Sequence, residues 1–178
     1  MTPELQAKID KAKETAIRNK TKGKIQDVKS KYRILSLDVS TYCGWAVSQT
    51  IFGCWDLSIK RDESSGMRML RFKAKLMEVI EAERINLVSF ERSAGVHKAA
   101  IIIQSELHGV LKLLLEELEI EYRAFSAKEI KKFATGNGNA PKSLMISSAK
   151  QKYGYTGDND NEADALHIFH LTKHDLGI

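Results

Sequence analysis

Two short apolar runs in this chain each end on a single acidic residue, and they constrain its fold more than any other feature. Ile34–Leu37 is followed by Asp38, and the run 86–90 is followed by Glu91. Runs of this length and composition predict buried strands. Residues that follow neighbouring parallel strands line the crevice where an α/β sheet binds its ligands. A carboxylate in that crevice needs solvent, a charged partner or a metal ion.

The segments around these runs predict a mixed α/β domain over residues 32–178. The expected strands cover residues 34–37, 45–47, 51–57, 86–90 and 120–124, and the expected helices cover 65–80, 99–117, 127–133, 142–153 and 162–174. Three strands in a row predict an antiparallel meander. The later strands alternate with helices, which favours parallel addition through helical crossovers.

The positive charge of the chain is concentrated in front of this domain. The first 33 residues hold ten basic and four acidic side chains, a net of +6, whereas the whole chain carries +5 and the remainder therefore −1. Thr2 and Pro3 are typical of a helix start. We expect residues 1–31 to form a basic helical arm and linker that contacts a polyanion. The alternative is that the arm packs on the domain or on a partner subunit.

Composition excludes several classes of protein. With 43% hydrophobic and 29% charged residues, the sequence predicts a soluble globular protein. The sequence has no apolar run near the roughly 18 residues of a membrane span, and its N-terminus lacks the apolar core of a signal peptide. We therefore expect a cytoplasmic protein with no membrane partner. Cys43 and Cys54 make neither a disulfide framework nor a CxxC zinc motif.

A third group of acids lies at residues 158–164, where a helix is expected to begin. In that helix Asp160 or Asn161 shares a face with Asp164. Together with Asp38 and Glu91, these side chains could converge on one or two Mg²⁺ ions, which prefer oxygen ligands. Two such ions about 3.5–4 Å apart support phosphodiester hydrolysis.

Each acid also has an ordinary structural interpretation. Asp38 could cap a turn, Glu91 could be a solvated acid paired with Arg92, and Asp164 could be favoured by the dipole of the first helical turn. The metal hypothesis therefore depends on the three acids being brought together by the fold.

These residues resemble the motifs of RuvC-type Holliday-junction resolvases of the ribonuclease H-like superfamily, in a form typical of phages. Residues 34–47 look like the strand-turn-strand motif with its first metal-binding aspartate, and 88–91 look like the second acidic motif. Residues 162–166 look like the acidic C-terminal helix. Residues 126–142, with a lysine on either side of a glycine loop, are similar to the segment that contacts DNA.

The resemblance implies a ribonuclease H-like mixed sheet flanked by helices, and the activity of a crossover junction endodeoxyribonuclease. It implies one or two Mg²⁺ or Mn²⁺ ions per subunit, held by Asp38, Glu91 and Asp164. Lys131 and Lys142 would contact the phosphate at the scissile bond. The implied partner is branched DNA, above all the four-way junction, cut symmetrically by a homodimer. The residues expected to contact DNA are Lys128, Lys131, Lys132, Asn137, Asn139, Lys142 and Tyr42.

One position departs from the family pattern. The family often has two acids three residues apart on the last helix, and the earlier position here is Asn161. Asparagine can ligate a metal through its carbonyl oxygen but brings no charge. Asp160, or Asp158 from the preceding loop, could instead supply the fourth ligand.

Other interpretations stay open. A non-catalytic DNA-binding module could keep the same fold with a decayed site. An actin-like kinase is remote because the chain is too short for two such domains. Residues 136–143 nearly fit a P-loop, but Pro141 replaces its last glycine and a helix precedes it.

Two further sets of side chains are assigned mainly to structure. The histidines of the last helix, His167, His170 and His174, favour surface or helix-end positions over a zinc site, although His167 could approach the metal site from one turn beyond Asp164. The apolar face of helix 99–117 is expected to be core, with part of it a dimer seam.

Overall fold

The computed structural model describes residues 31–93 and 98–178. The predicted basic arm therefore lies outside the described residues, apart from Lys31. The domain predicted for residues 32–178 lies within them, except for residues 94–97.

A single five-stranded mixed sheet forms the centre of the domain, with strand order β3-β2-β1-β4-β5. The strands are β1 (Ile34–Asp38), β2 (Tyr42–Ala46), β3 (Phe52–Asp56), β4 (Leu87–Glu91) and β5 (Glu121–Phe125). β1, β2 and β3 pair antiparallel, while β4 pairs parallel with both β1 and β5. This confirms the predicted meander with parallel additions. β2 begins at Tyr42, earlier than predicted, because Tyr42 still pairs with Asp56 of β3.

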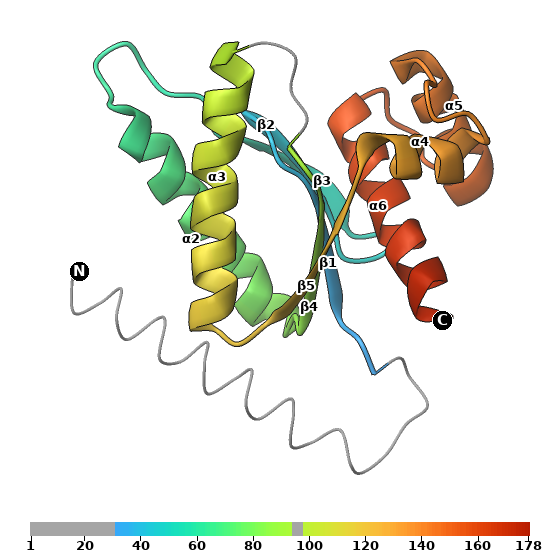
Figure 1. Ribbon diagram of the computed structural model, residues 1–178, viewed down its shortest axis with the longest axis horizontal. Coiled ribbons are helices and arrows are strands. Elements are labelled where there is room, and N and C mark those ends of the chain that lie inside the picture. Colours follow the sequence, from blue (N-terminus) through green and yellow to red (C-terminus); the bar gives the residue numbers. More distant parts are fainter. Residues whose placement is uncertain (1–30, 94–97) are drawn as a thin grey trace.

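Helices cover both faces of this sheet. They are α2 (Ser65–Glu83), α3 (Lys98–Glu117), α4 (Ala127–Thr135), α5 (Lys142–Tyr153) and α6 (Asp160–Leu176). Figure 1 shows α2 and α3 on one face and α6 on the other, with α4 and α5 beside α6. Among the described residues, no helix is both long enough and apolar enough to cross a membrane.

Among the described residues, three apolar clusters hold the structure together, and the two largest lie against the faces of the sheet. The larger lies between the sheet and α2 with α3, where Leu35, Phe72, Phe90 and Leu111 are almost fully buried. The second lies beneath α6, where small residues such as Ala163 and Ala165 let the helix approach the sheet closely. The helical periodicity of the apolar residues predicts the first core well, because α2 and α3 each bury one face.

The register of the sheet brings two of the predicted acids side by side. β1 and β4 run parallel, with Leu37 opposite Phe90. The next residue on each strand is an acid, Asp38 on β1 and Glu91 on β4. Both therefore lie at the same edge of the sheet, where parallel strands end together.

Side-chain caps fix where the helices around this edge begin. Ser126 and Glu129 form the reciprocal hydrogen bonds of a capping box at the start of α4, as the predicted cap at Ser126 requires. The side chain of Asn159 accepts hydrogen bonds from the first-turn amides of α6. Because of this cap, α6 begins at Asp160 and not at the predicted residue 162. Ser64 precedes α2, but its side chain makes no capping hydrogen bond.

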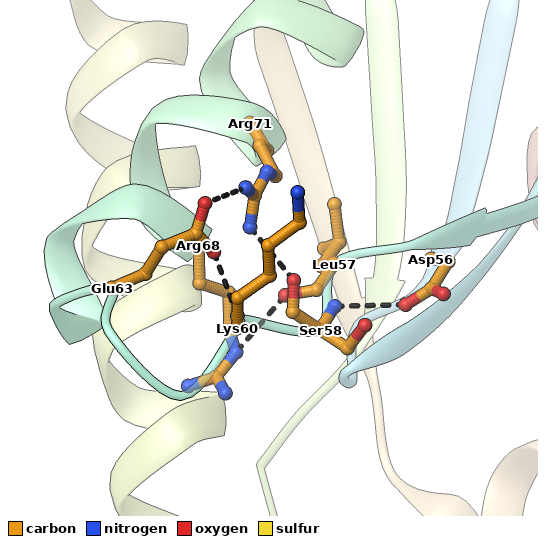
Figure 2. A network of polar contacts seen from close by, with 7 residues as sticks. All are labelled: Asp56, Leu57, Ser58, Lys60, Glu63, Arg68 and Arg71. Atoms are coloured by element: carbon orange, nitrogen blue, oxygen red, sulfur yellow. Dashed lines mark hydrogen bonds and ion pairs between the residues drawn. The ribbon is translucent and has the colours of Figure 1, made fainter.

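A polar network shapes the connection from β3 to α2 (Figure 2). The Arg68 guanidinium donates to the Leu57 carbonyl at 3.2 Å, and that of Arg71 donates to the Ser58 carbonyl at 2.8 Å. Arg71 also pairs with Glu63. These bonds tie the start of α2 to the end of the meander.

Candidate metal and DNA-binding site

Three acidic residues converge at the edge of the sheet. Asp38 ends β1, Glu91 ends the neighbouring β4, and Asp164 lies in the second turn of α6, which packs against β1 and β2. All three side chains are half-buried. Burial raises the pKa of Asp38 well above its ordinary value, and the nearby carboxylates of Asp164 and Glu91 raise it further. The fold thus brings together the three acids that the sequence singled out.

Asp164 is also repelled by neighbouring carboxylates. Burial, then the carboxylates of Glu91 and Asp160, raise its pKa to about 7. Its Oδ1 atom is buried and has no hydrogen-bond partner in the described part of the chain. Burial also raises the pKa of Glu91, against the opposing effect of Lys131. A buried, unpartnered carboxylate oxygen is costly unless a positive charge compensates it.

The residues considered for a fourth ligand have different partners. Lys142 pairs with Asp160, and this ion pair is the main reason why the pKa of Lys142 is raised. Asp158 pairs with Lys150 at 2.6 Å and its side chain is 89% exposed, so it extends away from the acids. Asn161 lies in the first turn of α6, and its backbone amide donates to Asn159.

Lys131 and Lys142 approach the acids from α4 and α5. The charge of Lys131 opposes the raised pKa values of Glu91 and Asp164, and that of Lys142 opposes those of Asp38 and Asp164. Two basic groups therefore lie close enough to act on the same carboxylates. The two lysines flank the glycine loop, as the sequence predicts.

The loop between these lysines is held by its own hydrogen bonds. Gly136 ends α4 with a φ of 79°, a left-handed conformation that glycine adopts without strain. The Asn137 side chain accepts a hydrogen bond from the Asn139 amide at 3.0 Å. Asn137 therefore shapes the turn, while Asn139 remains exposed at its tip.

α5 is fastened to the end of α4 by two hydrogen bonds to the same carbonyl. Ser148 Oγ and Lys152 Nζ each donate to the Ala134 carbonyl at 2.6 Å. These bonds satisfy a carbonyl that the helix end leaves unpaired.

The remaining predicted DNA contacts lie on the surface. Lys128 and Lys132 are exposed on α4. Tyr42 is 53% exposed and opens β2, two residues before the partner of Asp38 in the sheet. These side chains are accessible to a large ligand, and their roles stay predictions.

Two structural interpretations made from the sequence are wrong. Arg92 pairs with Glu129 at 3.1 Å rather than with Glu91, because the two side chains meet across the β4 and α4 ends. His167 is fully buried, with hydrogen bonds to the Met145 carbonyl and the Tyr153 hydroxyl. It therefore lies neither at the surface nor beside the acids.

His170 also departs from the predicted surface position. Its ring stacks on that of Tyr153, with 3.8 Å between the ring centroids. α5 covers this side of α6. Of the three histidines, only His174 is exposed as predicted.

One residue near the acids was missed. His108 of α3 is buried and contacts the Glu91 backbone carbonyl through Nε2 at 2.9 Å. Its Nδ1 contacts the Gln104 carbonyl at 2.7 Å. His108 thus anchors the end of β4. Its position among the apolar residues of the predicted helix gave no sign of a polar partner.

The oxygen atoms of the three acids suit a hard divalent cation, although the acids do not yet lie close enough together to form its ligand shell. Within residues 31–93 and 98–178, no group of three His, Cys, Asp or Glu side chains is disposed to hold a metal ion. The three acids act on one another electrostatically without forming a ready ligand shell. Their oxygen chemistry, their raised pKa values and the unpartnered Asp164 Oδ1 fit a divalent cation such as Mg²⁺.

Comparison with known sequences gives a partial match. A segment of 74 residues is 40% identical to crossover junction endodeoxyribonuclease RuvC of Brachyspira hyodysenteriae. The match covers 40% of this chain and 44% of that relative, so it spans less than half of the curated protein. No family model matches the chain.

Comparison with solved structures covers most of the chain. RuvC of Thermus thermophilus superposes with a TM-score of 0.63 at 18% identity, over 81% of this chain and 96% of that one. The same protein in complex with a Holliday junction substrate gives 0.64 at 19% identity, over 81% and 93%. The yeast mitochondrial Holliday junction resolvase Ydc2 gives 0.53 at 13% identity, over 77% and 75%. The resemblance seen in the sequence is confirmed, and the chain has the fold of RuvC.

Proposed function

We propose that this protein is a metal-dependent, structure-selective DNA endonuclease that resolves four-way junctions by phosphodiester hydrolysis. The observation that carries the proposal is the convergence of Asp38, Glu91 and Asp164 from three separate elements. Lys131 and Lys142 approach the same carboxylates. This combination offers ligands for cations and contacts for a phosphate at one place.

Asp38, Glu91 and Asp164 would hold one or two Mg²⁺ or Mn²⁺ ions per subunit. Asn161 would add its amide oxygen from the first turn of α6, at the position where the family often has a second acid. A divalent ion bound here would polarise the phosphate and lower the pKa of a bound water. The three side chains would have to draw together around the cation, and its charge would relieve the repulsion that raises their pKa values.

The lysines would position the DNA strand. Lys142, at the start of α5, would exchange its bond with Asp160 for a phosphate oxygen. Lys131 would hold the same phosphate or its neighbour from α4. Around them, phosphate contacts from exposed side chains would orient the junction without reading its sequence. These side chains are Lys128, Lys132, Asn137, Asn139 and Tyr42.

Branched DNA is the proposed substrate and a homodimer the proposed assembly. The Thermus structure in complex with a Holliday junction substrate supports the choice of substrate. On α3, Ile102 is 50% exposed and Leu113 is 60% exposed. They are three helical turns apart and so share one side of the helix. This apolar side would form the seam of a twofold dimer whose two sites cut two strands.

The proposal also includes a cytoplasmic location, where such a nuclease would meet DNA. The basic arm, outside the described residues, would add affinity through phosphate contacts that are independent of sequence. Each phosphate neutralised by a lysine or arginine steepens the loss of affinity with salt by about 0.9 in log–log slope. Deletion of residues 1–30 should therefore flatten this slope.

Cleavage of a synthetic four-way junction by the purified protein tests the function. We expect nicks at symmetric positions with Mg²⁺, none with EDTA, and little cleavage of a linear duplex of the same sequence. Asp38→Asn should abolish cleavage while junction binding is kept. Asp56→Asn is the matched control, because Asp56 ends β3 at the same edge but is exposed and bonds to Ser58.

The opposite outcomes are informative. Junction binding without metal-dependent cleavage by the native protein would favour a non-catalytic DNA-binding module, which the neutral Asn161 also fits. Near-native turnover by Asp38→Asn would show that the ligand assignment is wrong.

A further inference from the structure

A chain of three hydroxyl groups joins the three elements that carry the acids. Ser36 of β1, Ser89 of β4 and Thr172 of α6 are all fully buried. Ser36 Oγ lies 2.7 Å from Ser89 Oγ, and the two residues face each other in the parallel register. Thr172 Oγ1 lies 2.7 Å from Ser89 Oγ and 2.7 Å from the Ile168 carbonyl oxygen.

The Thr172 hydroxyl is the donor at its end of the chain. It donates to Ser89 Oγ and also lies within donating distance of the Ile168 carbonyl oxygen, which can only accept. Between Ser36 and Ser89 either hydroxyl could be the donor. The chain runs from the first strand, through its neighbour, into the backbone of α6. The hydrogen bonds between the three side chains form only while β1, β4 and α6 keep this alignment.

Two of the hydroxyls lie on the same strands as two of the acids. Ser36 precedes Asp38 by two residues, and Ser89 precedes Glu91 by two residues. Side chains two apart on a strand share a face. Asp38 and Glu91 therefore share with the two serines the face of the sheet that α6 covers (Figure 1). Thr172 lies about two turns along α6 from Asp164.

The rest of the contact between α6 and the sheet is mostly apolar. Ala163, Ala165 and Leu166 pack there without a directional bond. Such a contact alone resists sliding or rotation of the helix less than a hydrogen bond does, because hydrophobic attraction has no direction. The hydrogen bonds of the hydroxyl chain are directional and buried from water, so they oppose sliding and rotation of α6.

We propose that Ser36, Ser89 and Thr172 are positioning residues that set the depth and rotation of α6, so that Asp164 meets Asp38 and Glu91. The inference rests on the proposed function, since it concerns the same three acids. Without the chain of hydroxyls, the three carboxylates should bind a cation less tightly. A displacement of the order of 1 Å in such a constellation can lower a rate by about 10²-fold.

Thr172→Val tests the proposal, because valine keeps the shape of threonine but removes its hydroxyl. The Mg²⁺ concentration for half-maximal stabilisation is measured by thermal unfolding, and that for half-maximal single-turnover cleavage by junction assay. We expect both to rise roughly tenfold, as for outer-shell partners of metal ligands. Junction affinity without metal should be unchanged. Thr172→Ser should restore both midpoints.

Ser148→Ala is the control for a general loss of stability. Ser148 is buried and donates to the Ala134 carbonyl, but it links α5 to α4 and not the three acid-bearing elements. Its removal should lower the melting temperature without moving either Mg²⁺ midpoint. Should Thr172→Val fail to fold, Ser36→Ala takes its place. Ser36→Ala removes only the β1 end of the chain and should give a smaller shift in the same direction.

The outcomes separate this inference from the proposed function. If the native protein binds Mg²⁺ and cleaves the junction, while a folded Thr172→Val or Ser36→Ala keeps both native midpoints, the positioning role is wrong and the function stands. If the native protein neither binds Mg²⁺ nor cleaves, both proposals fall together.

Discussion

Gly44 of β2 lies directly against the backbone carbonyl of Asn161 in the first turn of α6. A Cβ at Gly44 would overlap that oxygen, and the Glu162 amide would be 3.1 Å away. In the sheet, Gly44 is the antiparallel partner of Asp38. The absence of a side chain at this position therefore lets the start of α6 approach the strand pair that carries the first acid.

Gly44→Ala should displace α6 and weaken the domain. The added methyl group meets backbone atoms, which cannot rotate away as a flexible side chain could. We expect a loss of about 1–3 kcal/mol in the free energy of unfolding, measured in urea. The Mg²⁺ midpoint should also rise, because Asp164 moves with the helix.

Gly66→Ala is the matched control for this substitution. Gly66 lies in the first turn of α2, and a Cβ there would meet only the Ser64 side chain, at an ordinary contact distance of 3.5 Å. Alanine should leave the free energy of unfolding unchanged or raise it by up to about 1 kcal/mol. Equal effects of the two substitutions would contradict the steric role of Gly44.

Much of this arrangement could be predicted from the sequence, because its signals are local. The acid at the end of each apolar run, the period of the helices and the cap at Ser126 all depend on residues close together in the chain. Parallel pairing of the two runs then places Asp38 beside Glu91. These features could be predicted from the order of the strands and helices along the chain.

Contacts between distant segments could not be predicted in the same way. The pairing of Lys142 with Asp160, the burial of His167 under α5 and the contact of Gly44 with Asn161 depend on how α6 docks. Docking is set by packing over the whole face of the sheet, which no short pattern encodes. Ser36 and Ser89 look like ordinary strand residues until Thr172 is placed above them.

The charge of Asp164 should destabilise the metal-free protein above neutral pH. Its folded-state pKa of about 7 lies above the ordinary value of 3.8, so the folded state holds the proton more tightly than the unfolded state. This contribution to stability is present at low pH and is lost as the pH rises through about 7. Because asparagine does not ionise, Asp164→Asn should not lose stability in this way as the pH rises.

Without metal, we therefore expect Asp164→Asn to be more stable than the native protein near pH 8 and similar to it near pH 4. Millimolar Mg²⁺ should stabilise the native protein and have little effect on the variant, because ligand binding stabilises only the state that binds. Urea unfolding at the two pH values checks both points. A variant that is less stable at the higher pH would contradict the repulsion among the acids.

The identity of the fourth ligand can be resolved by comparing two neighbours on α6. Asn161→Asp should keep or raise cleavage, because it adds a carboxylate where the family often has one. Asn161→Ala should lower cleavage more than Asp160→Ala does. Loss of Asp160 should instead tighten metal-free junction binding, since it frees Lys142 for a phosphate. Single-turnover cleavage and filter binding measure the two effects.

Asp158→Ala is the control for a change of charge near this loop, because Asp158 is exposed and pairs with Lys150. It should leave the cleavage rate close to native. If Asp160→Ala lowers cleavage more than Asn161→Ala does, Asp160 takes the ligand role in place of Asn161.

His170 should make the fold sensitive to acid. Burial lowers its pKa to about 4, with further lowering by Lys173 and His167, so the folded state binds its proton less readily than the unfolded state. Its contribution to the free energy of unfolding should therefore fall as the pH drops from about 6.5 towards 4. His170→Phe keeps a ring to stack on Tyr153 but cannot be protonated. The variant should lose less stability than the native protein between about pH 7 and pH 5 in urea unfolding.

Two other groups also change the pH dependence of stability, but both are present in the two proteins. His167 has a lowered pKa, and the raised pKa of Asp164 changes stability with pH in the opposite direction. The difference between variant and native protein therefore isolates the contribution of His170. A His170→Phe profile parallel to the native one would mean that the ring of His170 is protonated without cost in the folded protein.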